Sequence, residues 1–368
     1  MKDFQDVFSS SQGVFVIAEV GTSHQGDRSL ARELIAAAAE AGADCVKFQV
    51  VFADEIIHPL TGDVPLPGGK VRLYDRFKDV EQDEAFYAFC REQTEKAGLV
   101  FLASPFGVKS AQLLNRIGAS WFKVASPELN HFPLLRELDS YQRPLVLSSG
   151  VSYLADIEAA FAVLSGQKAL LHCVTAYPAP PEDYNLKVLQ PLSVLFGCPV
   201  GVSDHSMDPD LVPGVAAAVG ARLVEKHLCL DRSDPGLDDP IALDPALFRQ
   251  MVQTLREVQQ VPESQRLTWA VDRFGARVQA VLGSGKKQLA ESEKANYERT
   301  NRSLHVLRAL KAGHVLTAED VAVLRTEKVL RPGLSPQFLN LVLGRTLQRP
   351  VADGEGLVWD DLLPAGKL

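Results

Sequence analysis

Eight short segments rich in β-branched and other apolar residues alternate with helical patterns through the first part of the chain. They lie at residues 14–20, 43–50, 99–105, 120–126, 144–150, 169–175, 199–204 and 222–228. Most intervening segments carry apolar residues at i, i+3 and i+4, and several end in glycine, as helices do. Eight strand–helix repeats favour an α/β fold of the (β/α)8, or TIM barrel, type. An open doubly wound sheet is the alternative, and it lacks the GxGxxG motif expected after its first strand.

The remaining sequence predicts a second, smaller unit. Residues 245–260 predict a helix that closes the barrel, and the polar stretch GSGKKQLAESEKANYERT predicts a linker. Short β-like runs separated by Gly and Pro turns follow. We therefore expect a barrel over residues 1–283, a linker over 284–300 and a small β-rich domain over 301–368, near the lower size limit for independent folding. The long Pro- and Gly-rich loop at 52–77 predicts a lid or a substrate wall.

Composition limits the partners. The chain has 368 residues, 46% hydrophobic and 23% charged, with a net charge of −8, so a general nucleic-acid surface is not expected. Its apolar runs fall far short of the about 20 residues that span a bilayer, and the N-terminus lacks the plan of a signal peptide. Five scattered cysteines without a CxxC pair predict reduced thiols in the cytoplasm.

Each predicted strand ends in polar side chains. In a barrel the carboxyl ends of the strands converge on one active-site mouth. Lysines, serines and histidines at one level favour a functional site over structural ion pairs. The strand-end residues are Glu19; Lys47 and Gln49; Ser104; Lys123 and Ser126; Ser148 and Ser149; His172 and Thr175; Ser203, Asp204 and His205; and Glu225, Lys226 and His227.

Two of these residues, His205 and His227, follow neighbouring strands. Imidazole is a favoured ligand of divalent metals, and an open site keeps positions for water or substrate. Two histidines that only hydrogen-bond to the backbone are an equally good explanation of the spacing. Glu19 follows the first strand, beside the eighth, and could add a carboxylate directly or through a metal-bound water. Asp204 is expected to orient a neighbouring group.

Lysines and hydroxyls supply the means to bind a small anion. Lys47 and Lys123 provide charge, and no Gly-rich phosphate loop is present. An anion at the barrel centre and a metal at its edge would suit the joining of an enolate-like donor to a carbonyl acceptor. The hydroxyl donors are Ser104, Ser126, Ser148 and Ser203.

Short motifs in a fixed order run through nearly the whole chain. They are IAEVGTSHQGD (17–27), ADCVKFQ (43–49), ASPF (103–106), FKVASPE (122–128), LSSG (147–150), LLHCVTAYPAP (170–180), GVSDHS (201–206), EKHLCLD (225–231), NRSL (301–304) and LRPGLSP (330–336). With them the sequence resembles the sialic acid synthase family, which includes N-acetylneuraminate synthases and spore-coat polysaccharide synthases. The last two motifs are similar to the C-terminal antifreeze-like, or SAF, domain of that family.

The resemblance implies a reaction and a set of site residues. Phosphoenolpyruvate would condense with the aldehyde of an N-acetylated amino sugar, giving a nine-carbon 2-keto sugar acid and phosphate, with a divalent Mn²⁺ or Mg²⁺. It implies His205 and His227 as metal ligands, and Glu19, Lys47, Lys123 and Asp238 as catalytic residues. Phosphoenolpyruvate would also contact Ser104, Ser126, Ser148 and Ser203. The sugar would contact Gln49, Phe106, Glu128, Thr175, Tyr177 and, from the partner of a domain-swapped homodimer, Arg331.

Departures from the family pattern gather around the expected acceptor. Thr175 stands where N-acetylneuraminate synthases typically carry Asn, and GLDDPIALDP (236–245) replaces the usual GPDHKASLEP, which puts Asp239 and Pro240 in place of His and Lys. RPGLSP is a shortened form of RPGxGISP. The donor and metal positions are kept, so we expect an acceptor other than N-acetylmannosamine.

Two other functions remain open from the residues. Lys47 or Lys123 could form a Schiff base in a class I aldolase. The chain could instead be a non-catalytic sugar-phosphate-binding protein of polysaccharide assembly, its acceptor motif lost at Asp239 and Pro240. In every case we expect small-molecule ligands, no nucleic acid and no membrane.

Overall fold

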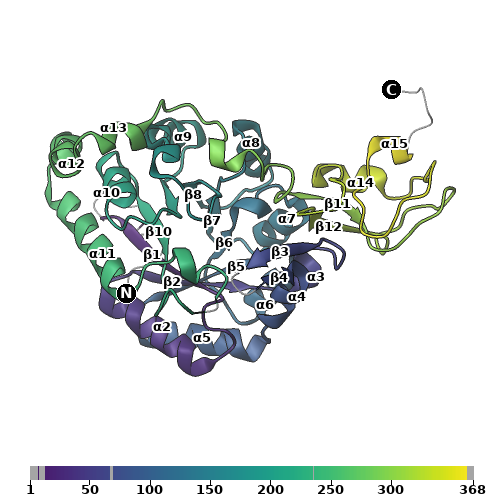
Figure 1. Cartoon of the computed structure of the whole chain (residues 1–368), viewed down its shortest axis with the longest axis horizontal. Helices are drawn as coiled ribbons and strands as arrows, with labels where there is room; N and C mark the ends of the chain where they lie inside the picture. The colour runs from purple at the N-terminus through teal and green to yellow at the C-terminus, as the bar shows by residue number, and fades with distance from the viewer. Residues whose placement is uncertain (1–6, 8–12, 67–68, 235, 363–368) are drawn as a thin grey trace.

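The structure is a computed structural model that describes residue 7 and residues 13–66, 69–234 and 236–362. Eight parallel strands are hydrogen-bonded in the order β5-β2-β1-β10-β9-β8-β7-β6, and β5 lies against β6. The sheet is therefore a nearly closed barrel, which confirms the TIM-type prediction over the open sheet (Figure 1). The strands are β1 (Phe15–Gly21), β2 (Cys45–Val50), β5 (Val100–Pro105), β6 (Phe122–Val124), β7 (Leu145–Ser148), β8 (Lys168–Cys173), β9 (Val200–Asp204) and β10 (Leu223–His227).

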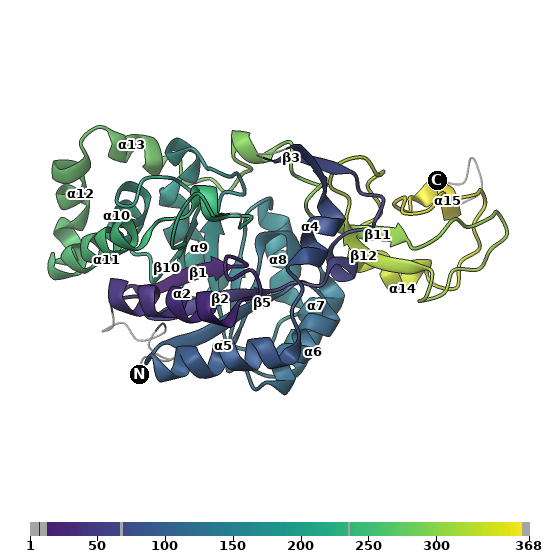
Figure 2. The ribbon, with the colours of Figure 1, turned by 60° about the horizontal axis from the view of Figure 1, so that its bottom comes forward.

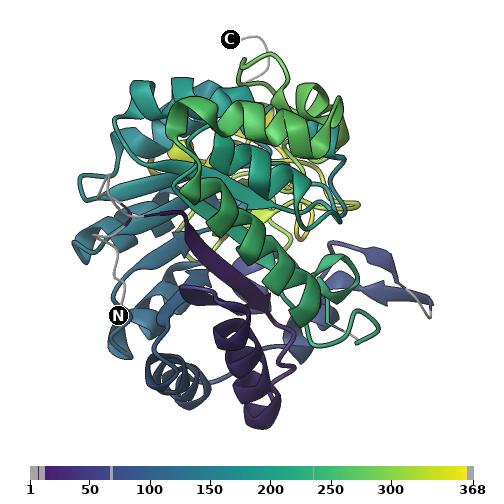
Figure 3. The same ribbon diagram turned by 90° about the vertical axis from the view of Figure 1, so that its left-hand side faces the viewer.

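Helices surround the barrel. The first begins where Asp27 accepts hydrogen bonds from the N–H groups of Ser29 and Leu30, and ends at Gly42 in a left-handed conformation (φ 87°), the usual capping chemistry. Figure 3 shows the long green helix α11 crossing the outer face of the barrel near the purple strand β1. The helices are α2 (Arg28–Ala41), α5 (Glu84–Lys96), α6 (Val108–Arg116), α7 (Phe132–Ser140), α8 (Leu154–Ala162), α9 (Leu189–Phe196), α10 (Leu211–Ala218) and α11 (Pro245–Gln260).

The two faces of each strand bury different side chains, because successive residues point to opposite sides. In β1, Val16 and Ala18 join the core between the barrel and its helices. Ile17 faces inward, where it packs with side chains from the other strands in a separate apolar cluster, the barrel floor: Phe15, Cys45, Val100, Leu102, Trp121, Val146, Ala169, Leu171 and Leu223. The next inward position along each strand lies above this floor, at the carboxyl end.

The long segment after β2 is not an irregular loop. It forms α3 (Ala53–Ile56), an antiparallel hairpin of β3 (Asp63–Leu66) and β4 (Gly69–Arg72), and α4 (Leu73–Asp79). Ile56, Ile57 and Phe106 share a small core with the helices of this segment. Figure 2 shows β3 and α4 on the side of the barrel that faces β11 and β12.

The C-terminal part forms a small β-rich unit that projects from one side of the barrel (Figure 1). Helices α12 (Arg266–Phe274) and α13 (Arg277–Leu282) first pack against α10. An antiparallel pair, β11 (Arg302–Val306) and β12 (Val321–Arg325), is followed by α14 (Leu339–Val342) and α15 (Trp359–Leu362). This unit has its own core, which includes Leu304, Leu316, Val342, Val351 and Leu357.

Short 3₁₀ turns complete the chain: η1 (Ser126–Glu128), η2 (Pro181–Tyr184), η3 (Leu186–Val188), η4 (Asp239–Ile241), η5 (Glu263–Gln265), η6 (Glu291–Glu293) and η7 (Pro336–Phe338). All five cysteines are buried and free. Within the described residues, no helix is both long enough and apolar enough to cross a bilayer.

Candidate active site

A ring of polar side chains lies directly above the barrel floor. Strand pairing places Glu19 beside Lys47 on one side and beside His227 on the other. Period-2 alternation explains the ring, because six of its members lie two residues after an apolar floor residue on their strands, while Ser203 follows Gly201 and His227 follows Glu225 at the same spacing. The buried members are Glu19, Lys47, Ser104, Lys123, Ser148, Ser203, Glu225 and His227.

Glu225 is the centre of this ring. Its Oε1 lies 3.0 Å from Lys47 Nζ and 3.7 Å from Lys123 Nζ, and it accepts a hydrogen bond of 2.9 Å from the Ser203 hydroxyl. Sequence reasoning placed Glu225 at a strand end but gave it no role. The signal was available, because Glu225 and His227 are two residues apart and so share the inward face of β10.

The charges at the centre do not balance. Burial favours a neutral Glu225, yet Lys123 and Lys47 lower its pKa to about 2. Burial instead raises the pKa of Glu19 to about 7, partly opposed by Lys47. Lys47 has a raised pKa, because the two carboxylates outweigh its burial. Near neutral pH two lysines thus face one permanent and one half-protonated carboxylate, which leaves positive charge for an anion.

The serine hydroxyls differ in whether they already have a hydrogen-bond partner. Ser148 Oγ accepts a hydrogen bond of 2.7 Å from Lys123 Nζ, and Ser126 Oγ accepts one of 3.0 Å from the Gly150 N–H. Ser104 Oγ is buried and has no hydrogen-bond partner within the described part of the chain. A buried hydroxyl without a partner is costly, so Ser104 is suited to donate to a bound ligand.

The two candidate metal ligands lie close together. Their ring centroids are 5.4 Å apart, and the half-exposed ring of Tyr177 stacks on His205 at 4.3 Å. His205 Nδ1 lies 2.9 Å from the Val174 carbonyl oxygen. That contact requires Nδ1 to carry the hydrogen, so in the neutral ring Nε2 keeps its lone pair.

The chemistry of these donors fits an open metal site with two protein ligands. Burial, reinforced by the charge of His205, holds the pKa of His227 well below its usual value, which keeps this ring neutral. Cys173 raises the pKa of His205 to about 9 against the effect of burial, so a metal would have to displace a proton there. Among the residues that the structure describes, no group of three or more His, Cys, Asp or Glu could hold a metal ion. Water and substrate would have to complete the coordination.

Asp238 joins the site from the segment after β10. Its Oδ2 lies 3.9 Å from His227 Nδ1. A side chain at Gly21 would come within 3.3–3.6 Å of atoms of Gln49, Glu19 and Asp238, so these three side chains adjoin over one glycine. Gln49 Nε2 donates a hydrogen bond of 2.7 Å to Glu19 Oε1.

Asp239, one of the departures near the expected acceptor, is turned into the protein. It is fully buried, and it accepts hydrogen bonds from the Ser23 hydroxyl and, at 2.9 Å, from the Gly236 N–H. In this structure Asp239 therefore stabilises the loop to which it belongs.

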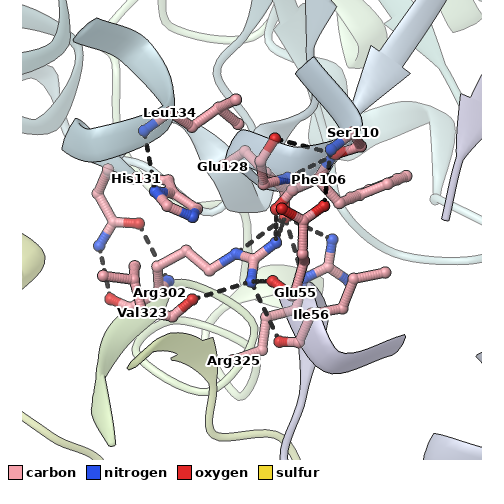
Figure 4. A network of polar contacts seen from close by, with 12 residues as sticks. Glu55, Ile56, Phe106, Ser110, Glu128, His131, Leu134, Arg302, Val323 and Arg325 are labelled. Atoms are coloured by element: carbon pink, nitrogen blue, oxygen red, sulfur yellow. Dashed lines mark hydrogen bonds and ion pairs between the residues drawn. The ribbon is translucent and has the colours of Figure 1, made fainter. Parts of the chain in front are cut away.

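Glu128 lies in a buried network between the barrel and the small domain (Figure 4). Its Oε1 accepts from Arg302 Nη2 at 2.9 Å and from Arg325 Nη2 at 2.7 Å, while Oε2 has no partner among the described residues. Arg302 also donates to the Phe106 carbonyl, and Arg325 lies over the Phe106 ring at 5.4 Å. Sequence reasoning assigned no role to either arginine.

Other sequence-derived residues lie apart from the ring. Arg331 stays within the small domain, where it pairs with Asp361 at 2.8 Å and donates to the Gly356 carbonyl. Thr175 is buried beside Cys173, with 3.9 Å between Oγ1 and Sγ.

Three strand-end residues face away from the barrel interior. Lys226 pairs with Asp204 at 2.6 Å on the outer side, and His172 Nε2 contacts the Tyr184 carbonyl at 2.6 Å. Asp204 therefore does not touch either candidate metal ligand through its side chain. Tyr184 lies between Asp204 and His205, and its hydroxyl accepts a hydrogen bond of 2.6 Å from the His205 N–H.

Comparisons with known proteins agree with this architecture. The spore coat polysaccharide biosynthesis protein SpsE of Bacillus subtilis is 34% identical over 361 residues, covering 95% of this chain and 94% of that protein. The N,N'-diacetyllegionaminic acid synthase of Legionella pneumophila is 31% identical over 365 residues, covering 96% of each. The crystal structure of SpsE from Bacillus subtilis superposes with a TM-score of 0.81 at 32% identity over 96% of both chains.

Profiles of known families match both parts of the chain. The NeuB family matches residues 34–266, which hold seven of the eight barrel strands and every member of the polar ring except Glu19 on β1. The SAF domain matches residues 301–363. The chain thus belongs to the NeuB family, the sialic acid synthase family expected from its motifs, and carries a SAF domain after the barrel.

Proposed function

We propose that this chain condenses phosphoenolpyruvate with the aldehyde of an N-acetylated amino sugar, giving a nine-carbon 2-keto sugar acid and phosphate for a surface polysaccharide. One observation carries the proposal: Lys47 and Lys123 converge on Glu225 at the centre of the barrel, next to two facing imidazoles. The names of the relatives, a sugar-acid synthase and a spore-coat polysaccharide protein, support it.

The lysines would hold the donor. Both ammonium groups already share Glu225, so a phosphate or carboxylate can take over contacts that the ring has prepared. Ser104 would add its free hydroxyl. Charge-assisted contacts of this kind contribute about 1.5–3 kcal/mol each. Ser126, Ser148 and Ser203 would set the positions of the groups around them.

In the reaction the methylene carbon of phosphoenolpyruvate bonds to the aldehyde carbon, the aldehyde oxygen takes a proton, water enters and phosphate leaves. Glu19 is suited to supply that proton, because burial raises its pKa to about 7. Asp238 adjoins it and would orient the acceptor. His205 and His227 would hold a divalent Mn²⁺ or Mg²⁺, which would supply Lewis-acid polarisation of the acceptor oxygen.

The acceptor would lie on the side of Tyr177, Thr175, Gln49, Phe106 and Glu128. Since Thr175 and the segment after β10 depart from the pattern of N-acetylneuraminate synthases, we propose an amino sugar other than N-acetylmannosamine, such as a diacetamido sugar. We also propose that the protein works in the cytoplasm as a homodimer in which Arg331 reaches the partner's sugar.

The test is turnover by the purified chain. Phosphate release and product mass are measured with phosphoenolpyruvate, Mn²⁺ or Mg²⁺ and a panel of N-acetylated amino sugars. We expect a nine-carbon product, a weak rate with N-acetylmannosamine, and loss of activity by about a thousandfold or more in His205→Ala. Covalent trapping of pyruvate by borohydride would favour the Schiff-base aldolase, and no phosphate release with any sugar would favour a binding protein. Full activity in excess chelator would rule out the proposed role of the metal.

A further inference from the structure

The segment between the barrel and the small domain places a buried carboxylate against the loops of the barrel. Glu293 is 1% exposed. Its Oε1 accepts hydrogen bonds of 2.7 Å from the N–H groups of both Val151 and Thr175, and its Oε2 accepts one of 3.2 Å from the Ala290 N–H. Val151 and Thr175 follow β7 and β8, so one side chain joins two neighbouring strand ends.

Two asparagines complete this grip on the backbone. Asn296 Nδ2 donates to the Thr175 carbonyl and Asn301 Nδ2 donates to the Val151 carbonyl, both at 3.0 Å. The backbone N–H and carbonyl groups of both Val151 and Thr175 are thus hydrogen-bonded to residues that follow the barrel in sequence. Val151 is β-branched and has a φ of +43°, a conformation that such a residue keeps only when its surroundings hold it.

The contact with Thr175 continues to His205 through a single peptide group. The Thr175 N–H and the Val174 carbonyl belong to the same peptide. The N–H donates to Glu293, and the carbonyl accepts from His205 Nδ1. Hydrogen bonds in series polarise one another, so the Glu293 carboxylate strengthens the carbonyl that fixes the tautomer of His205.

We propose that Glu293 is a positioning residue for His205, acting through the Val174–Thr175 peptide in the way that a carboxylate bonded directly to a metal-ligating histidine acts in many metal sites. In the neutral ring, it holds the hydrogen of His205 on Nδ1, which leaves the Nε2 lone pair available for a divalent cation. The relevance to catalysis rests on the proposed metal role of His205.

The proposal gives residues 284–300 a role in the site. Within this predicted linker, Glu293 and Asn296 bind the backbone of the barrel. The β8 loop that carries Thr175 is also the loop that sequence departures link to the acceptor. One carboxylate therefore joins the metal side and the acceptor side of the site.

The experiment compares Glu293→Ala and Glu293→Gln with the matched control Glu291→Ala. Glu291 lies two residues away, is 80% exposed in its side chain and pairs with Lys294. The first readout is the tautomer of neutral His205, from nitrogen NMR shifts of the metal-free full-length protein at a pH above about 9, where the ring has lost its extra proton. The second is the Kd for Mn²⁺ alone, and the third is the urea midpoint.

We expect Glu293→Ala to reduce the population of the Nδ1–H tautomer and to weaken Mn²⁺ binding about 10–100-fold, the usual effect of losing a group that orients a ligand. Glu293→Gln keeps an oxygen for both N–H groups and should lose less. Glu291→Ala should match the wild type. If Glu293→Ala fails to fold, Glu293→Gln and Asn296→Ala are read in the same way, with smaller shifts in the same direction.

The outcomes separate the two proposals. An unchanged tautomer and unchanged Mn²⁺ affinity in a folded Glu293 variant would overturn the positioning role while leaving the metal site intact. A wild-type chain that binds neither Mn²⁺ nor Mg²⁺ would overturn the proposed metal role, and the tautomer shift alone would then decide the role of Glu293. A lowered urea midpoint with neither specific change would show a purely structural residue.

Discussion

At the scale of residues, the site depends on Lys47 and Lys123 sharing one carboxylate. Glu225 is bonded to Lys47 and Ser203 and lies near Lys123. Because burial penalises every charge in this ring, each ionised group stays charged only through its oppositely charged or hydrogen-bonding neighbours. An arriving anion therefore competes with Glu225 for the lysines, so a change at Lys123 should alter donor affinity.

Lys123 should make donor binding depend on pH. Burial lowers its pKa to about 8, against the attraction of Glu225. The ammonium is charged below that pH and neutral above it, and a bound phosphate stabilises the charged form. The Kd for phosphoenolpyruvate should therefore rise above about pH 8, by up to about tenfold per pH unit, with proton uptake on binding, measured by calorimetry in buffers of different ionisation enthalpy.

Lys123→Met should bind the donor about tenfold or more weakly and lose this pH step. Lys47→Met should also bind weakly but keep the step, because the two carboxylates raise the pKa of Lys47. An unchanged pH profile in Lys123→Met would assign the step to another group.

Glu225→Gln should destabilise the free protein, because it leaves Lys47 and Lys123 close together without their shared carboxylate. Breaking a buried pair on one side typically costs about 3–5 kcal/mol. Added phosphate should restore more stability to this variant than to the wild type, since the anion replaces the missing charge. Urea unfolding with and without phosphate measures both effects, with Glu291→Gln as the surface control. Equal stabilisation of variant and wild type would place the anion away from the lysines.

At the scale of elements, strand alternation made most of the barrel predictable and also explains where prediction stopped. Eight apolar segments indicated the barrel, and strand ends indicated the mouth. Lys226 and His172 were grouped with the mouth, but the alternation of their strands turns them outward. The β3–β4 hairpin was not predicted, because its short strands are interrupted by Pro and Gly.

The contacts between elements were the least predictable part. Arg302, Arg325 and Glu293 bind residues that are far away in sequence. Local sequence patterns do not indicate such partners. The Glu128 network illustrates this, because Arg302 comes from β11 and donates to carbonyls of α3, β12 and the segment after β5.

Arg302→Met should loosen the small domain from the barrel. The side chain is fully buried, so its loss leaves carbonyl groups of both parts without a donor and Glu128 with Arg325 alone. We expect a loss of about 3–5 kcal/mol and faster proteolysis within residues 284–300. Arg308→Met is the control, because the Arg308 side chain is 63% exposed and, within the described part of the chain, forms an ion pair with Asp320 alone. Equal protease resistance in both variants would contradict this role of Arg302.

At the scale of the whole molecule, the small domain is joined to its own barrel through one buried network. Arg302 and Arg325 bind Glu128 of their own barrel. Arg331 lies on the Pro-containing turn of the small domain, held by Asp361 and the Gly356 carbonyl, and Pro332 stiffens the backbone beside it. A small domain fixed to its own barrel can present Arg331 to a second barrel.

Mixing two impaired variants, at a sugar concentration where each is slow alone, tests this arrangement. Arg331→Ala alone should raise the KM of the acceptor sugar with little effect on phosphoenolpyruvate. If Arg331 acts across a dimer, subunits of Arg331→Ala mixed with subunits of His205→Ala should recover up to about a quarter of wild-type activity, because half of the dimers would be mixed and each would hold one complete site. Activity after verified subunit exchange is the measurement. No recovery would confine Arg331 to its own chain.

The apolar barrel floor also bears on the order in which the proposed substrates would bind. Ile17, Leu102, Leu171 and Leu223 pack together below the charged ring, so the lysines are approached from the strand ends. In the proposed reaction, a donor held by the lysines would lie deeper than the sugar and would bind first. The sugar acid would then leave before the phosphate, and accumulated phosphate would slow the next cycle by occupying the donor position.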